Sequence, residues 1–179
     1  MPNAQTFTAA LIETMKTEGA LRTLSKGDLL IREGEVEKNL YYISSGAVRA
    51  FLLTEFEEQT VRFGYEGSII NSLSSYITGK PSELYIEAMR KTVVRVLTKD
   101  AVLRLVNKDA DSQQGYIHLL ETVIAQQIDR ENDLLTASPS ERLSRVLQRS
   151  PTLFQEVPLK YIASYLRMTP ETLSRVRNP

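Results

Sequence analysis

The C-terminal residues of the chain carry side chains of the types that bind nucleic acid. Residues 157–179 read VPLKYIASYLRMTPETLSRVRNP. The spacing of apolar residues predicts a helix from Pro158 to Leu166 and a second helix capped by Thr169, with Pro170 at its first position. Two helices joined by about three residues form a helix-turn-helix, whose second helix enters the major groove of DNA.

Hydroxyl, carboxylate and guanidinium groups share the exposed side of this predicted second helix. Such groups reach phosphates and base edges. The predicted DNA-binding residues are Lys160, Thr169, Glu171, Thr172, Ser174, Arg175 and Arg177. The core between the helices is predicted to contain Ile162, Leu166, Met168, Leu173 and Val176, with the small Ala163 at their closest approach. Arg167 stands where glycine usually adopts a left-handed backbone, which costs on the order of 1 kcal/mol.

Other chemistries are excluded by composition. The chain has no cysteine, so disulfides, thiolate metal sites and a cysteine nucleophile are ruled out. Its one histidine, His118, is too few for a polyhistidine metal site, and we interpret it as a half-buried helix residue. We therefore expect no catalytic residue, no metal, no cofactor and no enzymatic activity.

Charge is distributed unevenly, although the chain has 22 basic and 22 acidic residues. Residues 141–179 contain seven Lys and Arg side chains and only three acidic ones. A basic terminal segment on a mildly acidic body is typical of a small module that binds a polyanion. Chance clustering of charges is the alternative explanation.

The segment from about residue 24 to 97 has a β pattern. Short apolar runs alternate with turns that contain glycine, which is typical of a sandwich or small barrel. A short helix over 5–19 precedes it. The predicted strands include 29–31, 40–43, 48–53, 60–63, 84–86 and 93–97.

Helices return after Thr98, which is a suitable N-cap for a helix over 99–106. A long helix is predicted over 112–135, and its apolar stripe suggests a dimer interface at Ile117, Leu120, Ile124 and Ile128. Packing of the stripe against its own domain is the alternative. Ser138, Pro139 and Glu141 form a helix start, so we place the hinge at 136–139.

Nearly the whole chain resembles the Crp–Fnr superfamily of bacterial transcription regulators. The stretch LSKGDLLIREGEVEKNLYYISSGAVRAFL is similar to the start of a cyclic-nucleotide-binding β-roll, and the ending is similar to those of Bacteroidetes-type regulators. The resemblance implies an α+β fold with a β-roll (jelly roll) domain over 1–111, a dimerisation helix over 112–135 and a DNA-binding domain over 136–179. We expect the β-hairpin wing common in the superfamily to be missing or much reduced.

The resemblance breaks down in the phosphate-binding cassette. The family requires a Gly-Glu pair for the ribose and an Arg-Ser pair for the cyclic phosphate. This chain has Asn71-Ser72 and Ser82-Glu83 at these places. Losing the charge-assisted arginine pair costs several kcal/mol, so we predict a degenerate effector site that does not bind cyclic AMP.

These features together predict a cytoplasmic, homodimeric regulator that binds double-stranded DNA, with no membrane segment. A small-molecule effector of unknown identity and RNA polymerase are the further partners that the resemblance implies. The alternative is a ligand-binding or protein-interaction module whose helical tail does not bind DNA.

Overall fold

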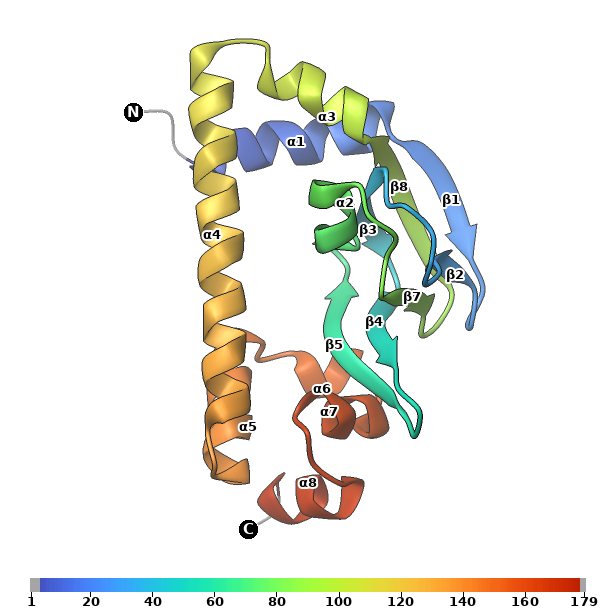
Figure 1. Cartoon of the computed structure of the whole chain (residues 1–179), viewed down its shortest axis with the longest axis vertical. Coiled ribbons are helices and arrows are strands. Elements are labelled where there is room, and N and C mark those ends of the chain that lie inside the picture. Colours follow the sequence, from blue (N-terminus) through green and yellow to red (C-terminus); the bar gives the residue numbers. More distant parts are fainter. Residues whose placement is uncertain (1–3, 178–179) are drawn as a thin grey trace.

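The computed structural model describes residues 4–177, and the side chains of residues 7–177. A β-roll lies beside one long helix, and a cluster of short helices lies at one end (Figure 1). The roll and its leading helix comprise α1 (Ala4–Glu18), β1 (Ala20–Leu24), β2 (Leu29–Ile31), β3 (Asn39–Ser45), β4 (Ala47–Leu53), β5 (Glu58–Tyr65), β6 (Ile69–Ile70), α2 (Leu73–Thr78), β7 (Tyr85–Ala88) and β8 (Thr92–Thr98). The following helices are α3 (Lys99–Val106), α4 (Ala110–Leu135), α5 (Pro139–Arg149), α6 (Leu153–Glu156), α7 (Leu159–Tyr165) and α8 (Pro170–Arg177).

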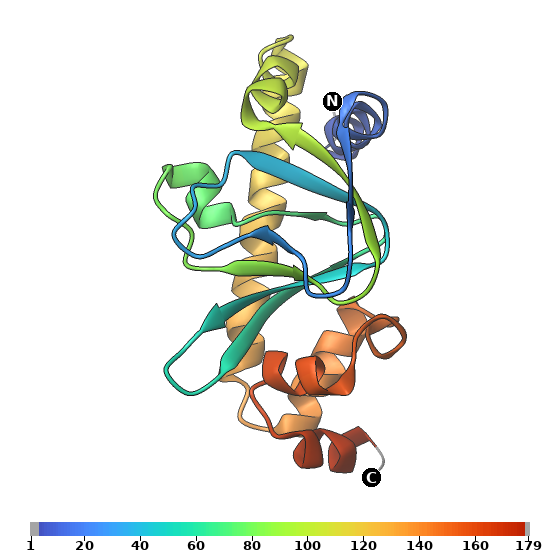
Figure 2. The same cartoon turned by 90° about the vertical axis from the view of Figure 1, so that its right-hand side faces the viewer.

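The β-roll consists of two four-stranded antiparallel sheets that share one core. Their strand orders are β1-β8-β3-β6 and β2-β7-β4-β5. Ile43 and Val94 from the first sheet and Val48 and Ile86 from the second are fully buried in one apolar cluster. Figure 2 shows the strands of the roll in front of the long helix α4. The fold is therefore the predicted α+β arrangement of a roll followed by helices.

Helix α1 covers the outer face of the first sheet and packs on α4. The close contact depends on Gly115 of α4, because a Cβ there would lie 2.5 Å from Cβ of Phe7. Leu11 and Met15 of α1 are fully buried in the same cluster. Glycine thus sets the distance between α1 and α4.

The predicted helix boundaries after the roll are confirmed to within a few residues. The Thr98 hydroxyl accepts a hydrogen bond from the Ala101 amide at the start of α3. Helix α4 begins two residues earlier than predicted, because the Asp109 carboxylate caps it through the Ser112 amide at 2.7 Å. It ends at Leu135 as predicted, and the Ser138 hydroxyl caps α5.

The terminal helices share an apolar cluster with the roll. Ala47 and Met89 of the roll are buried together with Leu143 of α5 and Ile162 of α7. In both views, α7 lies beside the end of the β4–β5 hairpin (Figures 1 and 2). The helices from α5 onward are therefore packed against the roll in this structure.

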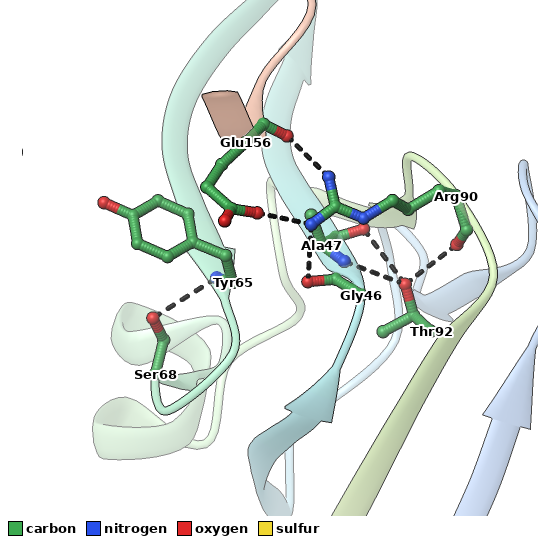
Figure 3. A network of polar contacts seen from close by, with 7 residues as sticks. All are labelled: Gly46, Ala47, Tyr65, Ser68, Arg90, Thr92 and Glu156. Carbon is green, nitrogen blue, oxygen red and sulfur yellow. Dashed lines mark hydrogen bonds and ion pairs between the residues drawn. The ribbon is translucent and has the colours of Figure 1, made fainter. Parts of the chain in front are cut away.

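Polar contacts also join these two parts. The Arg90 guanidinium donates to the Glu156 carbonyl at 2.8 Å and the Gly46 carbonyl at 3.3 Å, and it forms an ion pair with the Glu156 carboxylate (Figure 3). Elsewhere the Ser164 hydroxyl of α7 accepts from the Thr60 amide of β5 at 2.9 Å.

Arg49 of β4 is the most deeply buried cation at this junction. Its guanidinium lies 4.1 Å from the ring centres of both Phe51 and Tyr161. It also forms ion pairs with Glu58 and Glu87, and its side chain is only 4% exposed. Tyr161 belongs to α7, whereas Glu58 and Glu87 belong to β5 and β7. The Arg49 side chain therefore joins these two strands to the terminal helices.

Four short elements escaped prediction from the sequence: β1, β6, α2 and α6. Strand β1 is mostly exposed and β6 has two residues, so neither has a clear alternating pattern. Within residues 4–177, no helix is long and apolar enough to cross a bilayer.

Candidate DNA-binding and effector sites

Helices α7 and α8 form a closed helix-turn-helix. Ile162, Leu166 and Leu173 are at most 1% exposed, and Ala163 lies where the two helices approach, as predicted. Arg167 has a φ of 53°, which confirms the left-handed residue predicted for the turn. The hydrophobic core thus fixes the orientation of α8.

The outward side of α8 carries exposed polar groups. Glu171, Ser174 and Arg175 are exposed and line a shallow open surface. Arg175 forms no ion pair with any residue from 4 to 177. At the start of the helix the Thr169 hydroxyl accepts from the Thr172 amide at 3.2 Å, and Thr172 is half-buried. A cationic side chain is therefore available beside an acceptor and a hydroxyl.

Glu171 is held at the helix N-terminus. Hydrogen bonds from its own backbone amide and from the Thr169 hydroxyl lower the pKa of the Glu171 carboxyl. A negative charge at this end also interacts favourably with the helix dipole. Glu171 is therefore an ionised acceptor at neutral pH.

Two predicted DNA-binding cations are directed toward aromatic rings of the chain itself. The Lys160 ammonium lies 4.6 Å from the centre of the Tyr161 ring. The Arg177 guanidinium lies 4.6 Å from the centre of the Phe154 ring. Both residues are exposed.

Three other arginines of the basic segment are used within the fold. Arg145 and Arg149 form ion pairs with Asp133, whose side chain is 4% exposed. Arg142 donates to the carbonyls of Leu166 and Arg167 at the turn. The positive charge counted in the sequence therefore overstates what is available to a polyanion.

Helix α4 has two apolar faces. Ile117, Ile124 and Ile128 are exposed by 48%, 59% and 53% of their surface. Leu120, grouped with them from the sequence, is half-buried and lines a cavity on the side of the roll. The exposed face has isoleucine at positions separated by seven and four residues.

The residues predicted to form a degenerate effector site make hydrogen bonds within the chain. The Ser72 and Ser82 hydroxyls lie 2.8 Å apart, and Ser82 also bonds to the Leu84 backbone amide and carbonyl. Both serines are at most 3% exposed. Glu83 is exposed, whereas Asn71 is buried.

Sequence reasoning missed the charged residue in this cassette, Glu37. Its carboxylate accepts hydrogen bonds from the Asn39 amide at 2.9 Å, the Tyr41 hydroxyl at 3.2 Å and the Ser72 amide at 3.5 Å. Burial raises the pKa of the Glu37 carboxyl, and burial together with the Glu37 charge raises that of the Tyr41 phenol to about 12. The Glu37 carboxylate thus accepts hydrogen bonds from donors in and beside the predicted effector site, including the Ser72 amide.

His118 lies on α4, where its ring contacts the Glu121 carboxylate at 2.8 Å and Gln114 at 3.2 Å. Among residues 4–177, no group of three or more histidine, aspartate or glutamate side chains is placed to hold a metal ion.

The chain thus combines a β-roll, a long helix and a helix-turn-helix, which defines its structural class. Comparisons with known proteins support this class. Residues 21–109 match the family model described as "Cyclic nucleotide-binding domain". The fold is similar to that of FixK2 from Bradyrhizobium japonicum, with a TM-score of 0.76, 21% identity and coverage of 89% of this chain and 82% of that one.

Two curated sequences are similar over most of the chain. The "Fumarate and nitrate reduction regulatory protein" of Vibrio cholerae is 26% identical over 169 residues, and that of Yersinia pestis is 27% identical over 167. Each match covers 87% of this chain and 66% of the relative's length. This chain is therefore similar to these two regulatory proteins and spans about two thirds of their length.

Proposed function

We propose that this chain is a homodimeric transcription regulator that binds double-stranded DNA through α8. The main support is the outward side of α8, where Arg175 is exposed beside Glu171 on a helix held by a buried core. An α-helix of this kind fits the major groove, and arginine is the most frequent reader of guanine there. We divide the chain into a sensor-like domain over 1–111, a dimerisation helix over 112–135 and a DNA-binding domain over 136–179.

DNA binding is tested by gel shift of the full chain with genomic fragments at several salt concentrations. Each phosphate contact releases counterions, so six contacts per dimer weaken binding about 1,000-fold between about 50 and 200 mM salt. We expect such a steep fall. Binding that is absent, or insensitive to salt, would instead support the alternative of a protein-interaction module.

The second part of the proposal is dimerisation through the exposed face of α4. A long helix with a stripe of isoleucines buries this stripe best against a second copy around a twofold axis. We expect the double substitution Ile124→Lys and Ile128→Lys to give a monomer in sedimentation velocity, because it places charges in the apolar seam. The control is Leu103→Lys with Leu159→Lys, at exposed leucines of α3 and α7. A dimer that survives the first pair of substitutions contradicts this seam.

The third part concerns cyclic nucleotides. The cassette lacks the arginine that holds the phosphate, and Glu37 adds a negative charge beside Ser72. We expect calorimetry with cyclic AMP and cyclic GMP to show no binding below about the millimolar range, since unpaired like charges repel in a buried site. Micromolar binding of either nucleotide would contradict this part.

A further inference from the structure

The Arg142 side chain of α5 lies between the C-terminal ends of two other helices. Its Nε donates to the carbonyl of Thr136, the C-cap of α4, at 3.2 Å. Its Nη1 donates to the carbonyl of Leu166, the C-cap of α7, at 2.5 Å and to that of Arg167 at 3.3 Å. One guanidinium therefore bonds to three carbonyls, at the end of α4 and at the turn before α8.

Helix ends, rather than carboxylates, compensate the charge of this guanidinium. Arg142 is half-buried and forms no ion pair with any residue from 4 to 177. The last carbonyls of a helix have no partner within that helix and form the negative end of its dipole. Removal of the guanidinium would therefore take a charged donor away from the ends of α4 and α7 at once.

The turn that Arg142 contacts leads directly into α8. Arg167 in this turn has a φ of 53°, and among residues 4–177 it is the one residue other than glycine with a positive φ. A left-handed backbone is unfavourable for a residue with a Cβ, so the surrounding structure must support it. Hydrogen bonds from Arg142 to the carbonyls of Leu166 and Arg167 supply this support. Because Thr169 caps α8 two residues later, the turn sets where α8 begins.

We propose that Arg142 is a positioning residue for DNA recognition, which fixes α8 relative to the end of α4 without contacting DNA. This inference rests on the proposed function. Helix α4 carries the proposed dimer seam, so a tie from its end to the turn also sets the distance between the two copies of α8. A guanidinium holds its donors in a rigid planar fork, which lysine lacks. Arg142 therefore determines how strictly the dimer selects the number of base pairs between two half-sites.

The test uses duplexes whose half-sites are separated by the preferred number of base pairs, by one fewer and by one more. One base pair moves a half-site by about 3.4 Å along the DNA axis. In fluorescence anisotropy, the unmodified full chain should bind the preferred spacing about tenfold more tightly than either neighbour, as for one mismatched base pair. Arg142→Met should weaken binding to the preferred duplex about tenfold, the cost of one charged hydrogen bond, and should bind all three spacings alike.

Two further variants make this comparison specific. Arg104→Met, at an exposed arginine of α3, is the matched control and should leave both affinity and spacing preference unchanged. Arg142→Lys keeps the charge at the two helix ends but not the planar fork, so it keeps the comparison possible if Arg142→Met does not fold. It should recover part of the affinity and none of the spacing preference.

A purely stabilising role of Arg142 is separated by adding Arg167→Gly to Arg142→Met. Glycine removes the cost of the left-handed backbone, so the melting temperature should rise relative to Arg142→Met while the spacing preference stays lost. The proposal is overturned if folded Arg142→Met or Arg142→Lys keeps the spacing preference of the unmodified chain, or if the added glycine restores it. Absence of DNA binding by the unmodified chain contradicts the proposed function, and this inference with it.

Discussion

Replacing Arg49 with methionine should lower the free energy of unfolding by about 3 kcal/mol, the lower end of the cost of breaking a buried ion pair. Methionine keeps an unbranched stem but leaves Glu87 without its cation and removes the contacts with the rings of Phe51 and Tyr161. Glu58 is 48% exposed and can regain water, which places the loss at the lower end. The measurement is urea unfolding of the full chain.

The matched control for this change is Arg22→Met on β1. Arg22 is exposed and donates to a single carbonyl, that of Leu29, so its replacement should change stability by no more than about 0.5 kcal/mol. A double-mutant cycle that combines Arg49→Met with Tyr161→Leu then measures the interaction free energy between these two side chains, which join the roll to α7. A loss of less than about 1 kcal/mol for Arg49→Met would contradict its role in joining the two parts.

The second large effect concerns DNA affinity. Arg175→Ala should weaken binding to the preferred duplex by about 1–3 kcal/mol for each half-site, because a bidentate contact of arginine with guanine is lost. The sequence preference should relax at one base pair in each half-site. Fluorescence anisotropy with the preferred duplex and with single-base variants measures both effects, and Arg104→Ala on α3 is the control.

Two further substitutions separate base reading from phosphate binding. Glu171→Ala should change the sequence preference, because a carboxylate near DNA is favourable only where it accepts a hydrogen bond, as from a cytosine amine. Arg177→Ala, near the end of α8, should weaken all duplexes alike and reduce the salt slope. If both Arg175→Ala and Glu171→Ala leave affinity and preference unchanged, α8 does not read DNA.

Local chemistry made the helices and their caps predictable. Thr98, Ser138 and Thr169 each cap a helix by accepting from the amide three residues further on, and these contacts require only neighbours in the sequence. The left-handed backbone of Arg167 was predicted from its position in the turn, where glycine usually stands. The alternation of apolar residues and glycines similarly predicted the longer strands.

Long-range contacts account for what the sequence did not reveal. In the sequence, Glu37 stands in an acidic segment typical of a surface loop. The fold nevertheless buries it against Ser72, 35 positions away. Asp133 neutralises two arginines that were counted as free charge. Arg62 lies on a strand between ordinary apolar residues, and only the packing of α4 on the roll places it in a cavity.

Selection of duplexes from a random pool by the full chain tests the central claim most directly. We expect enrichment of a pseudo-palindrome whose half-sites lie about one helical turn apart, since a twofold dimer presents two copies of α8. The Arg175→Ala variant should enrich the same site with one position relaxed in each half. Failure of the unmodified chain to enrich any duplex, or enrichment that Arg175→Ala and Glu171→Ala leave unaltered, would contradict the assignment of α8 as the DNA reader.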